Sequence, residues 1–351
     1  MGKAERERLN RALGAHLNTI HETLQVLDRT ADSSLEKVKW EDVVKMGDEV
    51  SKQATVVGML CTGAAPEAKG LEENMVTYFN MLQGLLLLSH GSTVGAGSTL
   101  SSVVHAAVKQ VVDASFKLWM DVVSSYGSSK KDGTLSETQL VGAVWEACSA
   151  LKKTPATNIT AIGRAMTQAA LSIKDVLREM KELKPEGGPA DEPSNYSSNP
   201  EENKSNDTND SSDDELGSDL SLAEMKIAQS TINLVSQTLA LIKELIRSIT
   251  GLIKLESSNS SSNFVDTLER LLKLCQDISL QVDELGASLY PPQELSSIMT
   301  ASEKISTDSV EILAELQALN SLSDSFLQCI NSVKNAVKQQ QAEIKSSSPD
   351  D

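Results

Sequence analysis

The chain has 351 residues, of which 40% are hydrophobic and only 3% aromatic. A β-sandwich or β-barrel of this length normally uses many aromatic and β-branched residues, whereas this chain relies on Leu, Ile, Val, Ala and Met, which favours helices. The net charge is −17, and no segment has the excess of Lys and Arg that binding to a phosphate backbone requires. Composition therefore argues against an all-β fold and against autonomous binding of DNA or RNA.

Apolar residues at helical spacing fill most of residues 1–184 and predict an N-terminal bundle of about five to six helices. We expect helices near 13–27, 40–60, 71–89, 100–124, 140–151 and 162–183. No useful stretch alternates with a period of two, so no strand is predicted. The Gly-rich stretch 91–98 lacks the Gly-Lys-Ser/Thr ending of a phosphate loop, and we interpret it as a helix–helix loop with Ser98 or Thr99 as N-cap.

Residues 185–219 differ from the rest of the chain in composition. They carry 11 acidic residues against Lys204 alone, and they are rich in Ser, Asn, Gly and Pro. Such a segment cannot bury enough apolar surface to offset its chain entropy, so we predict a disordered acidic linker. We expect residues 347–351 to form a disordered tail.

Residues 220–346 contain long heptad stripes that predict a C-terminal bundle of about four helices. The stripes run through about 228–253, 264–289, 298–319 and 326–337. They have two interpretations, which the pattern alone leaves open. The stripes form the internal core of the bundle, or one of them is a seam shared with a partner helix.

The linker also contains a candidate regulatory site. Ser211 and Ser212 each have an acidic residue three positions later, a pattern that kinases with basic substrate grooves favour. The alternative is a solvating spacer that is never modified.

No pattern typical of an enzyme or a metal site is found. The histidines have no carboxylate at metal-ligand spacing, and no nucleophile elbow occurs. The sequence 132–137 resembles half of a calcium loop, but Lys130 occupies a ligand position, which excludes the site. We therefore expect a protein without catalytic residues, cofactor or metal.

The N-terminus is charged and lacks the apolar core of a signal peptide, and the longest apolar run, Leu85–Leu88, is too short to cross a bilayer. The four cysteines are scattered, as is typical of unpaired thiols in a reducing compartment. We expect the protein in the cytoplasm and the nucleus.

Two short segments carry a family resemblance: Val144-Trp145-Glu146-Ala147-Cys148 and Leu285-Gly286-Ala287-Ser288-Leu289-Tyr290-Pro291-Pro292. They resemble the Val-Trp-x-Ala-Cys and Leu/Ser/Tyr-Pro-Pro segments of the cyclin-D-binding proteins, also called cyclin-D-interacting helix-loop-helix proteins. The order of a helical region, an acidic centre and a second helical region is similar too. The residues that match are Leu285, Ser288, Leu289, Tyr290, Pro291, Pro292, Trp145 and Cys148.

The resemblance implies an all-helical protein that binds D-type cyclins and helix-loop-helix factors and negatively regulates cell-cycle progression and transcription. Members lack the basic region with which helix-loop-helix dimers grip DNA, so a factor paired with one would lose half its phosphate contacts. The contact residues for partners are not implied, nor is the oligomeric state. From the residues alone, a second class of function fits: a helical scaffold or adaptor of the cytoskeletal or vesicle-associated type.

Overall fold

The computed structural model describes residues 2–27, 31, 34–61, 67–127, 137–184, 220–254 and 262–347. These residues form ten α-helices and one 3-10 turn, and they contain no β-strand. The helices are α1 (Gly2–Leu27), α2 (Trp40–Leu60), α3 (Ala68–Ser92), α4 (Ser98–Ser125), α5 (Glu137–Leu151), α6 (Asn158–Met180), α7 (Leu222–Gly251), α8 (Ser262–Ser288), α9 (Leu295–Ala318) and α10 (Asp324–Ser347), with the turn η1 at Leu252–Lys254. The all-α class is confirmed, with six helices before the acidic segment and four after it.

Most helices begin and end within a few residues of the positions that the apolar stripes predict. The two exceptions are α1, which begins at Gly2, and α10, which continues to Ser347. Both extensions carry isolated buried residues, Leu9 and Ile344, among polar side chains, so their apolar pattern is too sparse to be seen in the sequence. No helix in the described ranges combines the length and the apolar character needed to cross a bilayer.

The chain forms two compact units, each built from two segments. The first comprises 1–164 with 252–270, and the second comprises 165–251 with 271–351. The units therefore differ from the sequence division at 185–219. The reason is local: Asn158 at the start of α6 and Glu269 in α8 both bond to the loop and first turn of α4, as described below.

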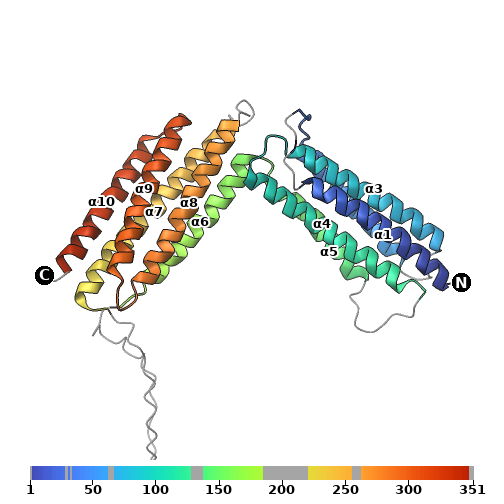
Figure 1. Ribbon diagram of the computed structural model, residues 1–351, viewed down its shortest axis with the longest axis horizontal. Helices are drawn as coiled ribbons and strands as arrows, with labels where there is room; N and C mark the ends of the chain where they lie inside the picture. The colour runs from blue at the N-terminus through green and yellow to red at the C-terminus, as the bar shows by residue number, and fades with distance from the viewer. Residues whose placement is uncertain are drawn as a thin grey trace, which may run out of the picture. The chain divides into compact units, whose positions relative to one another are not determined.

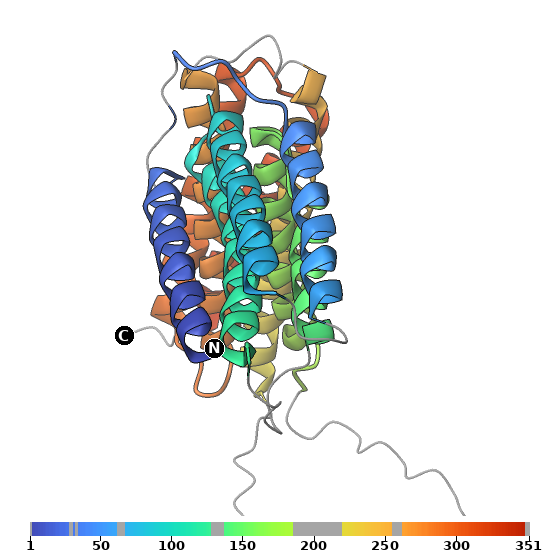
Figure 2. The same ribbon diagram turned by 90° about the vertical axis from the view of Figure 1, so that its right-hand side faces the viewer.

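In the first unit, α1 packs on α3 and α4, α2 on α3 and α5, and α4 on α5. Figure 2 shows these helices running side by side along a common direction. An aromatic cluster fills the centre, where Tyr78 meets Trp119 edge-on at 5.7 Å between ring centroids. The Tyr78 hydroxyl lies 2.7 Å from the Ser115 hydroxyl, which satisfies a polar group inside an apolar core.

In the second unit, α7 packs along α10, and α10 along α9 (Figure 1). The heptad residues point inward: Ile242, Cys275, Ile305 and Val333 are all fully buried. The interpretation of the stripes as internal core is therefore confirmed for these residues. Ile253 is an exception, because it falls in η1 beyond the end of α7 and is 45% exposed.

A buried polar bridge joins three helices of the second unit. The Gln340 amide of α10 donates to the Thr231 hydroxyl of α7 over 2.6 Å, and its carbonyl oxygen accepts from Ser302 of α9. Gln340, Thr231 and Ser302 are fully buried. The bridge fixes the register of the three helices, because a shift along the axis would leave buried polar groups unpaired.

Candidate interaction surface

The segment that matches the family-specific motif ends α8 and begins the turn to α9. Leu285 and Leu289 are fully buried in the core of the second unit, and Ser288 is nearly so. Pro291 and Pro292 follow, and neither has the backbone N–H that a further helical turn would require. Sequence and burial together explain why the helix ends at Ser288.

Hydrogen bonds hold this turn in place. The backbone N–H of Glu294 donates to the Ser288 carbonyl over 3.2 Å. The Gln293 amide donates to the Leu289 carbonyl over 3.3 Å and to the Glu224 carbonyl at the start of α7 over 3.1 Å. The turn is thus tied to α7, which makes it a rigid platform for the side chain that it presents.

That side chain is Tyr290, which is 51% exposed in a chain with few aromatic residues. It stands at one end of a groove between α6 and α8, which we call the α6–α8 groove. The groove has a volume of about 310 Å³. Its lining residues are Val176, Glu179, Met180, Leu183, Asp283, Gly286, Ala287 and Tyr290.

The floor of the groove depends on a glycine. An ideal Cβ on Gly286 would lie 2.8 Å from Val176 Cγ1, which is closer than side-chain carbons approach one another. Glycine at this position therefore lets α6 lie directly against α8. Next to the Gly286–Val176 contact, the side chain of Ala287 is too small to fill the space between the helices. The depression that results is bordered by Tyr290.

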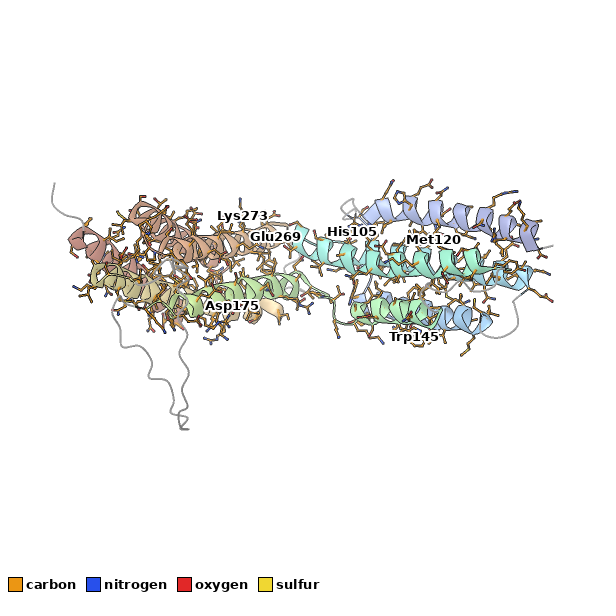
Figure 3. All side chains as sticks on the ribbon, turned by 90° about the horizontal axis from the view of Figure 1, so that it is seen from below. His105, Met120, Trp145, Asp175, Glu269 and Lys273 are labelled. Atoms are coloured by element: carbon orange, nitrogen blue, oxygen red, sulfur yellow. The ribbon has the colours of Figure 1, made fainter. Side chains whose placement is uncertain are left out.

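The charged lining residues of the groove are Glu179 and Asp283, and no basic side chain lines it. Among the residues that the structure describes, neither carboxylate has an ion-pair partner. Arg178 of α6 pairs instead with the exposed Asp175, which Figure 3 labels. Partial burial raises the pKa of the Asp283 carboxyl above its ordinary value. The groove thus combines apolar walls with unneutralised negative charge.

The other family-like residues, Trp145 and Cys148, lie on α5 in the first unit. Trp145 is 45% exposed, and its indole N–H donates to the Thr55 hydroxyl of α2 over 3.0 Å (Figure 3). Cys148 is buried, and burial raises its pKa to about 12. The half-exposed Trp145 therefore links α5 to α2 by a hydrogen bond, and Cys148 is a core residue.

The start of α4 corrects the expected N-cap. Neither Ser98 nor Thr99 caps the helix; Gly97 occupies the N-cap position and has no side chain to offer. Instead, the Glu269 carboxylate of α8 accepts the Thr99 N–H at 2.8 Å and the Thr99 hydroxyl at 2.6 Å. Asn158 accepts the Gly97 N–H at 2.8 Å. A carboxylate at this position also complements the helix dipole.

Several predictions from the sequence concern chemistry or modification. Within the described ranges, no cluster of His, Cys, Asp and Glu has the arrangement of a metal site. Ser211, Ser212 and most of the 132–137 stretch lie outside the described residues. All four cysteines are described and none forms a disulfide; Cys148 and Cys275 are buried, whereas Cys61 and Cys329 are half-buried.

Sequence reasoning found Tyr290 but missed the residues of α6 that face it. Val176, Met180 and Leu183 belong to an ordinary amphipathic stripe, and nothing local indicates which helix they meet. The one available signal was Gly286, because an isolated glycine inside a helical pattern often marks a close approach of another backbone. Glu269 gave no signal, since its partner is 170 residues away.

Comparison with known families decides the relationship. A sequence model described as Grap2 and cyclin-D-interacting, N-terminal, matches residues 42–186, and its C-terminal counterpart matches residues 205–314. The chain belongs to this family.

Individual relatives agree with the family match. The Cyclin-D1-binding protein 1 homolog of Xenopus laevis is 25% identical over 284 residues, covering 78% of each chain. Cyclin-D1-binding protein 1 of Homo sapiens is 26% identical over 209 residues, covering 60% of this chain and 56% of the human one. The Pongo abelii protein of the same name matches to the same extent.

Proposed function

We propose that this chain is a non-enzymatic interaction protein that binds a D-type cyclin, with the α6–α8 groove as part of the contact. Family membership and the names of the relatives support cyclin as the partner. The observation that carries the choice of surface is Tyr290. It belongs to the segment most specific to the family resemblance, and it is held exposed at the groove by a rigid turn. Exposed aromatic residues beside apolar depressions are typical of binding hot spots.

Isothermal titration calorimetry with the purified full chain and a purified D-type cyclin tests this function. We expect Tyr290→Ala to weaken binding about tenfold or more, as is usual for an aromatic hot-spot residue. Val310→Ala is the matched control, because Val310 is an exposed apolar residue of the same unit outside the groove. Absence of binding by the unaltered chain would refute the function, and equal affinities for the two variants would refute the choice of surface.

We further propose that binding makes the protein a negative regulator of cell-cycle progression and of transcription. A helix-loop-helix factor held by this acidic chain would form a complex with too few basic residues to grip DNA. Because the stripe residues of α7 and α8 are core, such a factor would have to bind an outer face. Gel-shift titration of a purified factor tests this: DNA binding that persists at saturating chain concentration would contradict it.

Modification and location complete the proposal. We propose phosphorylation at Ser211 and Ser212, which would deepen the negative charge of the 185–219 segment. Phosphate-affinity electrophoresis of protein from cells tests it, and mobility unchanged by replacing both serines with alanine would refute it. We also propose that the protein works in the cytoplasm and the nucleus. Imaging of a fluorescently tagged chain in cells tests this location, and absence of the tagged chain from either compartment would contradict it.

A further inference from the structure

A second groove lies on the other side of α8, between α8 and α9, and we call it the α8–α9 groove. It has a volume of about 780 Å³. Asp283 and Ala287 line both grooves, so the last turns of α8 form a ridge with a depression on each flank. Leu280 on this ridge is 61% exposed, and Tyr290 stands at its end. The ridge therefore presents exposed apolar side chains beside acidic ones.

The charge on this surface has one sign. Glu284 joins Asp283 in the α8–α9 groove, and Glu179 faces Asp283 across the α6–α8 groove. No Lys or Arg lines either groove, and within the described residues none of the three carboxylates has an ion-pair partner. By contrast, Asp175 on the exposed side of α6 pairs with Arg178 over 3.5 Å. Three carboxylates without an ion-pair partner therefore lie beside these two depressions.

Negative charges grouped without counter-charges destabilise the unit that carries them, and a partner with positive charges would relieve the repulsion. Partial burial of Asp283 adds to this, because a carboxylate removed from part of its hydration gains more from a neighbouring cation. Apolar anchors with flanking basic residues are thus the chemistry that complements the surface. An acidic partner, the 185–219 segment of this chain included, would be repelled.

We propose that the two grooves beside α8 bind an amphipathic helix of a partner protein that carries Leu- or Met-type anchors and flanking Lys or Arg residues. The anchors, spaced one turn apart, would enter the depressions beside Ala287 and Tyr290. The basic residues would pair with Glu179, Asp283 and Glu284. The inference rests on the proposed function in taking the partner to be a protein that contacts the α6–α8 groove, and it adds the chemistry of the segment that is recognised.

The test uses the full chain and three ligands: a purified D-type cyclin, a synthetic 16-residue amphipathic Leu/Lys helix, and the matching Leu/Glu helix. Fluorescence anisotropy measures affinity at about 0.05 M and about 0.5 M salt, since screening weakens exposed charge pairs. The variants are Glu179→Lys with Asp283→Lys together, and Asp283→Asn alone. Glu22→Lys on α1 is the matched control, because Glu22 is an exposed helical glutamate outside both grooves. Circular dichroism verifies that each variant is folded.

We expect the double reversal to weaken binding of cyclin and of the Leu/Lys helix about tenfold at low salt, and the control to change it less than about twofold. Asp283→Asn should weaken it about twofold to threefold, and high salt should weaken binding to the unaltered chain. Cyclin binding that is insensitive to the double reversal overturns the inference while the proposed function stands. Equal affinity for the Leu/Glu helix also overturns it. Binding of the Leu/Lys helix, lost on double reversal, without any cyclin binding refutes the proposed function and supports the inference. Failure of both ligands overturns both.

Discussion

The carboxylate of Glu269 should be a stabilising cap for α4, although it lies on another helix. We consider replacing it with alanine, which removes both acceptors, and with glutamine, which keeps one oxygen and removes the charge. In the folded chain the carboxylate accepts the Thr99 N–H at 2.8 Å and the Thr99 hydroxyl at 2.6 Å. The N-cap residue, Gly97, has no side chain with which to cap the helix, and the Asn158 side chain accepts the Gly97 N–H, which precedes the first turn of α4.

The magnitude follows from these two bonds. A hydrogen bond to a charged group contributes about 1.5–3 kcal/mol when it is shielded, and less here because Thr99 is half-buried and water replaces part of the loss. A charge at a helix N-terminus adds about 0.3–1 kcal/mol. We therefore expect Glu269→Ala to reduce the free energy of unfolding by about 2 kcal/mol, and Glu269→Gln by about 1 kcal/mol.

Urea unfolding followed by circular dichroism gives the global effect, and amide hydrogen exchange at Thr99 gives the local one. Local exchange matters because a chain with two units need not unfold in one step. Glu22→Ala, also a helical Glu-to-Ala change but without a cap, corrects for helix propensity. The reasoning is refuted if Glu269→Ala differs from Glu22→Ala by less than about 0.5 kcal/mol and Thr99 exchange is unchanged.

Three further predictions concern the second unit and the cysteines. Ile242→Asp should lower the free energy of unfolding by about 4 kcal/mol in thermal melts, because Ile242 is fully buried and the new charge would be unpaired; an unchanged melting temperature would contradict this. Burial raises the pKa of Asp308 despite the nearby Lys304, so the folded chain binds this proton more tightly than the unfolded chain does. Asp308→Asn should therefore increase stability at pH 7, and urea unfolding at several pH values should show the gain shrinking as pH falls towards the ordinary range of an aspartate. Burial raises the pKa of Cys148 and of Cys275 to about 12, so neither thiol should react with iodoacetamide at pH 8 until the chain is denatured; peptide mass spectrometry would reveal early labelling if the reasoning fails.

The helices themselves were predictable because their cores are aliphatic and regular. A stripe such as that through Ile242 places an apolar residue every three or four positions, and burial of that face alone specifies a helix. The start of α1 and the end of α10 were not predictable, because the buried residues there are isolated among polar ones. The composition of two compact units from two segments each was not predictable for a different reason: composition reveals where a core-forming sequence stops, but not which core a helix joins.

The candidate surface was predictable only in part. Tyr290 and the two prolines stand out because proline ends a helix by its chemistry, independently of the surroundings. The α6 side of the groove depends on which helix Gly286 faces, and that pairing is a property of the tertiary fold. The prediction of Ser98 or Thr99 as the N-cap of α4 was wrong for the same reason. Capping rules consider residues that are near in sequence, whereas Glu269 is brought to this helix end by the packing of α8.

Each compact unit contains two separate segments of the chain, and this limits where the chain can be cut to make fragments. A fragment that ends anywhere in 185–219 would leave the first unit without 252–270, and hence without the Glu269 carboxylate. It would also separate 165–184 from the second unit, and with them Val176 and Glu179 of the groove. Halves expressed alone should therefore be poor reagents for mapping partners, whereas co-expressed halves could reassemble by fragment complementation. If an isolated half failed to bind a partner, the first explanation would be its incomplete fold. The failure would not show that the contact residues lie in the other half.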